Sequence, residues 1–392
     1  MLERFIGAYL FQPAALDYSS DTCRNGCAYC FANINQAERE GNLKGAVNKF
    51  YKKEVKSYDD MLLRDGYPIC ISNRSDPFTE RNWRDTVALS QHLVNIPNGI
   101  YIQTKCGPGM DEALDILGDK KPVIYITVTT IRDDISRVLE PNAPLPSERL
   151  RIAADLHRRG YLVLIAVNPC AEQWMPREDL EALCVQLKAA GIRHVVIECL
   201  DMSRNRIKIL PQSRIDRIGA AALEDCRTGR VRGYVRECTE YLIKTRMIVC
   251  KKGMPFRSSI FDDIKARLGK TMPVMQDFVN YCIDNRKGGA VTFDEFDKVI
   301  RGGRGGVFDV SIQGSSIRDY LLRAGFVSWK ANQKVPTHRD LLRIVWNDPR
   351  HRISIQKHCL FSLTDKKDPE GNAVLWFDGK ADLGQKKEVI PL

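Results

Sequence analysis

Short apolar runs alternate with amphipathic segments through the first half of this 392-residue chain. The apolar runs are rich in β-branched and aromatic residues, which predicts buried strands at Pro68–Ser72, Ile100–Thr104, Val123–Val128, Tyr161–Val167 and His194–Glu198. The segments between them have the periodicity of helices, at Arg84–Asn95, Met110–Leu117, Ser147–Arg159 and Arg177–Ala190. Repeated strand–helix units predict an α/β fold with a parallel sheet and right-handed crossovers.

This alternation fades after Asp201, which places a predicted boundary near residue 205. We therefore expect one α/β domain over residues 1–205 and a second region over residues 206–392. In that region Ile207–Leu210 is predicted as one last strand, and Ile215–Asp225 and Val235–Val249 are predicted as helices.

A mainly helical unit is expected from about residue 271 onward. Thr292 with Glu295 three residues later is a capping-box start for one of its helices. Two strand-like runs, Ile353–Leu363 and Ala373–Phe377, flank the turn-forming segment Asp368–Asn372 and predict a hairpin. Short helices followed by a hairpin suggest a winged-helix-like arrangement.

Three cysteines, Cys23, Cys27 and Cys30, lie within eight residues near the start of the chain. Gly26 allows a tight backbone path between them, so one loop can present three thiolates to one inorganic centre. An iron–sulfur cubane usually takes four cysteines, so three would leave one iron open. A structural zinc site also needs four ligands, and no further Cys or His precedes Cys70. The spacing favours an iron–sulfur cluster over zinc or unrelated thiols.

The cysteine spacing, with Tyr29 directly before the last thiol, resembles the radical S-adenosylmethionine (SAM) enzymes. The resemblance implies a [4Fe-4S] cluster whose open iron chelates the amino and carboxyl groups of SAM. It also implies reductive cleavage of SAM to methionine and a 5′-deoxyadenosyl radical, which takes a hydrogen atom from the substrate. The fold it implies for residues 1–205 is a partial (β/α)6 barrel.

Segments at the ends of successive predicted strands resemble the spore photoproduct lyase-like branch of that family. They are Ser75–Glu80, Thr104–Lys105, Thr129–Thr130, Glu140–Pro144 followed by Arg149–Leu150, and Asn168–Pro169. Function in parallel sheets gathers at the carboxyl ends of strands, where Ser75–Glu80, Thr104–Lys105, Thr129–Thr130 and Asn168–Pro169 fall. Each segment is weak alone, but their order along the chain makes the resemblance specific.

The resemblance assigns several of these side chains to SAM. Ser75 and Asp76 are expected to accept hydrogen bonds from its ammonium, and Lys105 is expected to meet its carboxylate. Arg149 is expected to share the task of Lys105 or to brace Glu140.

The ribose and the adenine of SAM have their own expected partners. Thr129 has a hydroxyl suited to the ribose, and Thr127 is the alternative because only one parity of a strand faces inward. Tyr29 is expected to pack on the cluster or the adenine, and Asn168 to meet the adenine edge. The protein would hold the reactive carbon of SAM against one substrate hydrogen, while the radical chemistry belongs to the cofactor.

One position departs from the branch pattern. Spore photoproduct lyases carry a hydrogen-donating cysteine two residues before the serine of the second-strand segment, and that position is Asn73 here. Cys70 lies further back in the same predicted strand and Cys106 directly follows Lys105, but both are predicted to be buried core thiols. This departure puts the repair of spore photoproduct in doubt.

The excess of positive over negative charge lies entirely in the second half of the chain. The formal net charge is +11, and residues 206–392 alone hold 35 Lys and Arg against 22 Asp and Glu. A concentrated basic surface attracts nucleic acid by releasing its counterions, whereas the alternative is a generically basic domain. Arg301 and Arg304 lie in a Gly-rich segment that resembles a phosphate-contacting loop, with a flexible basic linker as the alternative.

These observations leave three hypotheses for function. The first is a radical SAM enzyme that modifies or repairs a nucleic-acid base, with DNA as the expected partner and flavodoxin or ferredoxin as the expected electron donor. The second is a radical SAM enzyme acting on a small molecule or peptide. The third is a non-enzymatic iron–sulfur protein that binds nucleic acid.

The expected compartment is the cytoplasm. Thirteen cysteines without a disulfide framework fit a reducing compartment. No secretory signal is expected, because Met1–Phe5 lacks a basic flank followed by a long apolar run. No apolar stretch approaches the length that spans a bilayer, so no membrane partner is expected.

Overall fold

The computed structural model describes only part of the chain. The described residues are 14–15, 18, 23–30, 69–72, 75–251, 263–264, 267–268, 278, 281–282, 285–302, 339, 343, 346–347 and 361–378. Asn73 and Arg304 lie outside them, as does the predicted helix at 316–324.

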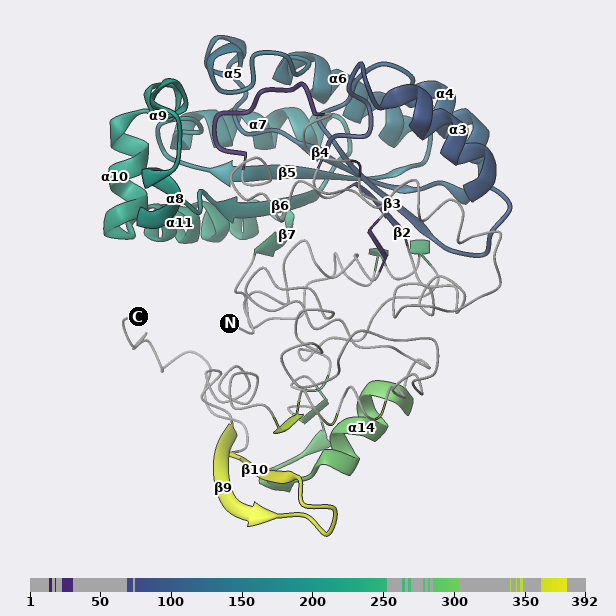
Figure 1. Cartoon of the computed structure of the whole chain (residues 1–392), viewed down its shortest axis with the longest axis vertical. Coiled ribbons are helices and arrows are strands. Elements are labelled where there is room, and N and C mark those ends of the chain that lie inside the picture. The colour runs from purple at the N-terminus through teal and green to yellow at the C-terminus, as the bar shows by residue number, and fades with distance from the viewer. Residues whose placement is uncertain are drawn as a thin grey trace.

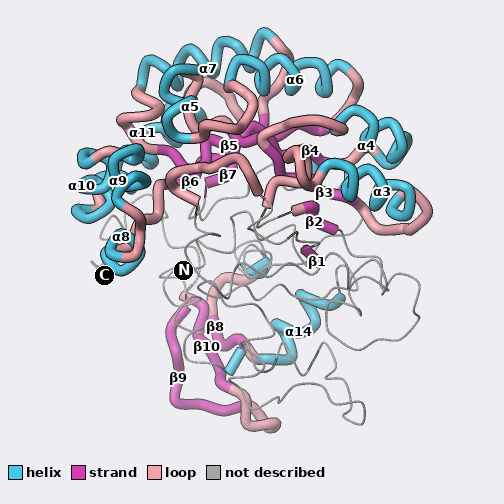
Figure 2. Tube along the Cα trace, turned by 45° about the horizontal axis from the view of Figure 1, so that its top comes forward, coloured by secondary structure: helices cyan, strands magenta, loops and turns pink. Residues whose placement is uncertain are grey.

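A parallel β-sheet forms the centre of the first part of the chain. Its strands follow one another across the sheet in sequence order (Figure 2): β1 (Ala14–Ala15), β2 (Ile69–Ile71), β3 (Ile100–Thr104), β4 (Val123–Thr127), β5 (Leu162–Cys170), β6 (His194–Cys199) and β7 (Ile248–Lys251). Every neighbouring pair is parallel. The predicted α/β class and parallel sheet are confirmed, and six strands precede residue 205 among the described residues. β7 carries the sheet beyond that expected boundary.

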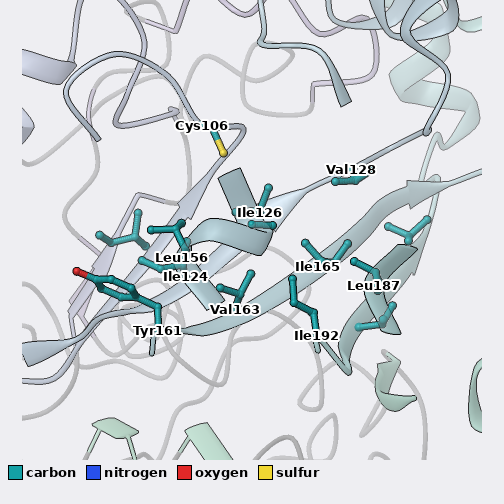
Figure 3. Packing of buried hydrophobic residues seen from close by; sticks show 14 of the residues in the cluster. Cys106, Ile124, Ile126, Val128, Leu156, Tyr161, Val163, Ile165, Leu187 and Ile192 are labelled. Atoms are coloured by element: carbon teal, nitrogen blue, oxygen red, sulfur yellow. The ribbon is translucent and has the colours of Figure 1, made fainter. Parts of the chain in front are cut away.

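Helices cover one face of this sheet (Figure 1), as expected for right-handed β–α–β crossovers. They are α3 (Trp83–Leu93), α4 (Met110–Leu117), α6 (Pro146–Arg158), α7 (Arg177–Ala189) and, in the crossover from β6 to β7, α11 (Arg230–Lys244). Alternate side chains of β4 and β5, such as Ile124, Ile126, Val163 and Ile165, pack under these helices (Figure 3). The helix-covered face holds the main hydrophobic core, and we call the opposite face the inner face.

The inner face is apolar over the part nearest the amino ends of its strands. Tyr101, Tyr125 and Leu164 form a buried cluster there with Ile264 and Leu268. Cys70 belongs to the same cluster, whereas Cys106 lies in the core under the helices. Both thiols are therefore buried core residues, as predicted.

Gly99 permits the closest backbone contact of this inner cluster. A Cβ atom at Gly99 would lie 2.6 Å from the carbonyl oxygen and 2.9 Å from the Cα atom of Leu268. We expect Gly99→Ala to lower the free energy of unfolding by about 1–3 kcal/mol, as overpacking does. Gly233→Ala is the matched control, because a Cβ there meets open space within a helix that alanine favours. Equal urea midpoints for Gly99→Ala and the wild type would contradict the expected clash.

The segment between β6 and β7 differs from its prediction. Ile207–Leu210 is not a strand, because Ile207 and Lys208 belong to α8 (Arg204–Lys208), whose first turn is capped by the Ser203 hydroxyl accepting from the Arg206 amide. The predicted helix at 215–225 is two helices, α9 (Gln212–Ile218) and α10 (Ala220–Thr228), which break at Gly219 where φ is +88°. The end of the predicted helix at 235–249 is instead β7.

A separate antiparallel sheet lies in the second region, in the order β8 (Gly289–Val291), β10 (Ala373–Phe377), β9 (Phe361–Lys367). The predicted hairpin is confirmed by the pairing of β9 with β10, but β9 runs on to Lys367, beyond the predicted strand end at Leu363, and residues 353–360 lie outside the described residues. The predicted cap of α14 (Phe293–Gly302) is also confirmed, because the Thr292 hydroxyl accepts from the Glu295 amide at 3.4 Å. Arg301 lies in the last turn of that helix rather than in a loop. The winged-helix-like arrangement stays a prediction.

Within the described residues, the structure contains no helix that combines the length and the apolar character needed to cross a bilayer.

Candidate active site

The cysteine loop, residues 23–30, is held by backbone contacts to the segment that follows α5 (Asp133–Leu139). The Ala28 amide donates to the Leu139 carbonyl at 2.8 Å, and the Asn142 amide donates to the Asn25 carbonyl at 3.3 Å. The Asn142 side chain adds a bond of 2.7 Å to the Arg24 carbonyl. Gly26 adopts φ +66°, and a Cβ there would lie 3.2 Å from Pro141. The loop therefore has a fixed path that does not depend on its thiols.

Two arginines of α9 support the same loop from a distant part of the sequence. Arg214 donates to the carbonyls of Cys27 at 2.7 Å and Cys30 at 3.3 Å, and Arg217 donates to the Gly26 carbonyl at 3.0 Å. Burial lowers the pKa of Arg214, as does the neighbouring charge of Arg217, whereas Cys30 opposes the shift. No pattern in the sequence indicated this pair, because α9 resembles any basic surface helix.

The three cysteines of the loop are free thiols, with Cys27 buried and Cys23 and Cys30 half-buried. In the part of the chain that the structure describes, no three Cys, His, Asp or Glu side chains are gathered as a ready metal-binding group. Burial raises the pKa of Cys27, the nearby Lys105 ammonium opposes this, and the other two thiols lie close enough to contribute. Three free thiols on one turn, with cationic side chains beside them, are a donor set that fits an iron–sulfur cluster.

Glu140 is the centre of a buried polar network next to the loop. Its carboxylate accepts from the Tyr29 hydroxyl, from Thr129 at 2.9 Å and from Arg149 Nη2 at 2.5 Å. Lys105 Nζ lies 3.6 Å from the same carboxylate and 5.6 Å from the centre of the Tyr29 ring. Glu140 and Arg149 are 1% and 0% exposed, so this pair is fully withdrawn from water.

The charges of this network stabilise one another against the cost of burial. Burial disfavours ionised Glu140, but Lys105, Arg149 and the hydrogen bonds outweigh it and lower the pKa of Glu140 from 4.5 to about 2. Burial likewise opposes the charges of Lys105 and Arg149, yet Glu140 raises the pKa of both. This network therefore contains two cations, Lys105 and Arg149, and one anion, Glu140.

Asp76 ties the cysteine loop to two strands. One oxygen accepts from the Phe78 amide at 3.0 Å and from Thr104 at 2.8 Å. The other accepts from the Lys105 amide at 2.6 Å and from Asn25 at 3.2 Å. A carboxylate has about four lone-pair sites, so protein donors fill the acceptor capacity of Asp76.

The structure brings most of the sequence-predicted site residues to one place, the carboxyl edge of the sheet. Cys23, Cys27, Cys30, Tyr29, Asp76, Lys105, Thr129, Glu140 and Arg149 share this connected set of contacts. The expected contact of Asp76 with the SAM ammonium stays a prediction. Arg149 takes the second of its two expected roles, because it braces Glu140 and donates to the Pro144 and Thr127 carbonyls. Lys105 keeps 12% of its side chain exposed.

The remaining predicted residues flank this set. Ser75 is buried and accepts from the Asn82 side chain at 3.0 Å. Asn168 donates to the Tyr125 hydroxyl at 3.0 Å, which places its amide on the inner face. The Asn168 carbonyl meets the Thr129 hydroxyl at 3.4 Å. Arg301 and Arg304 play no described part in this site, because the side chain of Arg301 and all of Arg304 lie outside the described residues.

A search for known family models found no match to this sequence. An uncharacterised protein of Acidianus two-tailed virus is 21% identical over 211 residues, which is 50% of this chain and 69% of that protein. A radical SAM Nα-GlyT isomerase of Pseudomonas phage M6 is 25% identical over 189 residues, or 46% of this chain. The match spans only 38% of the length of the isomerase.

Among solved structures, SuiB of Streptococcus suis bound to S-adenosylmethionine matches 58% of this chain and 44% of its own chain. The TM-score is 0.34 and the sequence identity is 14%, so nothing about the site follows from this match. Taken together, the comparisons make this chain similar in sequence to a phage radical SAM enzyme.

Proposed function

We propose that this protein is a radical SAM enzyme whose [4Fe-4S] cluster is held by Cys23, Cys27 and Cys30. The observation that carries the proposal is the free cysteine loop, docked at the carboxyl edge of a parallel sheet beside buried Glu140 and its cations. The sequence similarity to the phage radical SAM isomerase supports the same proposal. When bound, the cluster would supply the electron that cleaves SAM to methionine and a 5′-deoxyadenosyl radical.

The side chains around the loop would bind and orient SAM. Lys105 is the partially exposed cation of the site and would meet the SAM carboxylate. The Tyr29 ring lies under the Lys105 ammonium, and its centre is 5.8 Å from that of the Trp174 ring. Tyr29 would cover the sulfonium or the adenine of SAM. Asn168 would meet the adenine edge, and Thr129 or Thr127 the ribose. Membership in the spore photoproduct lyase-like branch remains part of this proposal.

We propose a nucleic-acid base, most simply in DNA, as the substrate class. The basic surplus of residues 206–392 would supply the phosphate contacts. An enzyme that reaches a base carbon needs that base exposed or flipped out of the stack. A flavodoxin- or ferredoxin-like protein would deliver the electron.

Anaerobic reconstitution tests the proposal directly. The protein is loaded with iron and sulfide, reduced in the presence of SAM, and assayed for 5′-deoxyadenosine. We expect 5′-deoxyadenosine from the reconstituted protein and a higher yield when single-stranded DNA is added. A full cluster without SAM cleavage would instead favour a non-enzymatic iron–sulfur protein that binds nucleic acid.

Salt dependence tests the substrate class. We expect binding of single-stranded DNA to weaken linearly on a log–log plot against salt, with a slope of about −0.7 per phosphate contacted. Arg301→Ala/Arg304→Ala should make the slope shallower by the equivalent of roughly one to two phosphate contacts, because each arginine is expected to neutralise one phosphate. Lack of binding at low salt would leave a small molecule or peptide as the substrate class.

A further inference from the structure

The inner face of the sheet has two zones of different chemistry. Toward the amino ends of the strands, Ile264 and Leu268 cover Tyr101, Tyr125 and Leu164 in the apolar cluster described above. Toward the carboxyl ends, the inward positions become polar and include Asn168 on β5 and Glu198 on β6. This polar zone adjoins the proposed SAM site, because the Asn168 carbonyl meets Thr129.

Strand alternation places the Glu198 side chain in this polar zone. Val196 belongs to the inner cluster, whereas Val195 and Ile197 belong to the core under the helices. Glu198 follows Val196 by two residues and so points to the inner face. Burial chiefly raises the pKa of Tyr101, the neighbouring Tyr125 and Cys70 add to the shift, and the charge of Glu198 makes a smaller contribution in the same direction.

One oxygen of this carboxylate has no hydrogen-bond partner among the described residues. Glu198 Oε1 is buried and accepts no hydrogen bond from the described residues, in contrast to Glu140 and Asp76, whose oxygens accept several. A buried carboxylate oxygen without a donor is costly. Such an atom is suited to a donor that arrives with a bound molecule.

We propose that Glu198 accepts a hydrogen bond from an N–H group of a purine or pyrimidine bound over the inner face. Carboxylates accept from base N–H groups, and asparagine side chains read the neighbouring edge of a base, so Glu198 and Asn168 together suit a heterocycle that carries both donors and acceptors. The heterocycle could be the adenine of SAM or a base of the substrate. This inference rests on the proposed function.

Binding to the reconstituted full-length protein distinguishes the two sources. The probes are SAM and single-stranded oligodeoxythymidylate and oligodeoxycytidylate, titrated into the wild type, Glu198→Gln and Glu198→Ala. Because a hydrogen bond to a charged group is lost, we expect the affinity for one probe to fall on the order of 10- to 100-fold. A loss for SAM alone assigns the N–H to adenine, and a loss for an oligonucleotide alone assigns it to the substrate base.

The exposed Glu181→Gln is the matched control, since Glu181 lies on α7 and pairs with Arg177. Without probes, Glu198→Gln should melt at or above the wild-type temperature, because it removes the charge from a carboxylate that has one buried oxygen without a donor among the described residues. Unchanged affinities of both Glu198 variants for every probe that the wild type binds would overturn the inference, as would marked destabilisation by Glu198→Gln. Neither result would touch the proposed function, which fails only if the reduced wild type forms no 5′-deoxyadenosine.

Discussion

Replacing all three loop cysteines, as Cys23→Ala/Cys27→Ala/Cys30→Ala, is expected to reduce both bound iron and 5′-deoxyadenosine formation to background. The three thiols are the only ligands that the loop offers, so their removal leaves nothing to hold a cluster. The fold should survive, because backbone groups position the loop through Leu139, Asn142 and Arg214. The measurements are iron content, visible absorbance and product yield after reduction with SAM.

Cys184→Ala is the matched control for this triple variant. Cys184 is a buried thiol on α7 within the core under the helices, and its loss should leave iron content and product yield unchanged. Iron binding that survives in the triple variant would refute the assignment of the cluster to the loop. Circular dichroism of both variants separates loss of the cluster from loss of the fold.

Local pattern was enough to predict most of the sheet. β3 and α4 have the predicted bounds, and β4, β6, α6 and α7 differ from prediction by one residue at one or both ends. Strands buried on both faces give continuous apolar runs, which makes them visible in a sequence. β7 was not predicted, because its residues Ile248–Lys251 continue the apolar pattern of α11. Only the pairing of this segment with β6 makes it a strand rather than the end of a helix.

The members of the site could be predicted more readily than their roles. Motif resemblance found Asp76 and Arg149, but no pattern in the sequence could show that protein donors fill the Asp76 carboxylate or that Arg149 turns toward Glu140. Those facts depend on contacts between segments far apart in the chain. The roles of Arg214 and Glu198 were missed for the same reason, because each depends on residues that are brought near only by the tertiary fold.

Replacing Glu140 with glutamine is expected to lower the free energy of unfolding by about 3–5 kcal/mol near neutral pH, because it leaves the buried Arg149 cation and the nearby Lys105 without their anion. Glu181→Gln is the matched control, because it breaks an exposed pair with Arg177 that contributes about 0–1 kcal/mol. Urea unfolding of both variants without cofactor measures the difference. If Glu140→Gln lowers the free energy of unfolding no more than Glu181→Gln does, the network around Glu140 does not stabilise the fold.

The same carboxylate makes stability depend on pH in a defined window. The pKa of Glu140 is lowered in the folded protein from 4.5 to about 2, so its contribution is fully present above pH 4.5 and is lost as the pH falls toward 2. At 1.36 kcal/mol per pKa unit, that contribution is roughly 3 kcal/mol. The stability difference between the wild type and Glu140→Gln should therefore shrink by about that amount between pH 5 and pH 2. A difference that stays constant over this range would mean that Glu140 is not the ionised partner of Arg149 and Lys105.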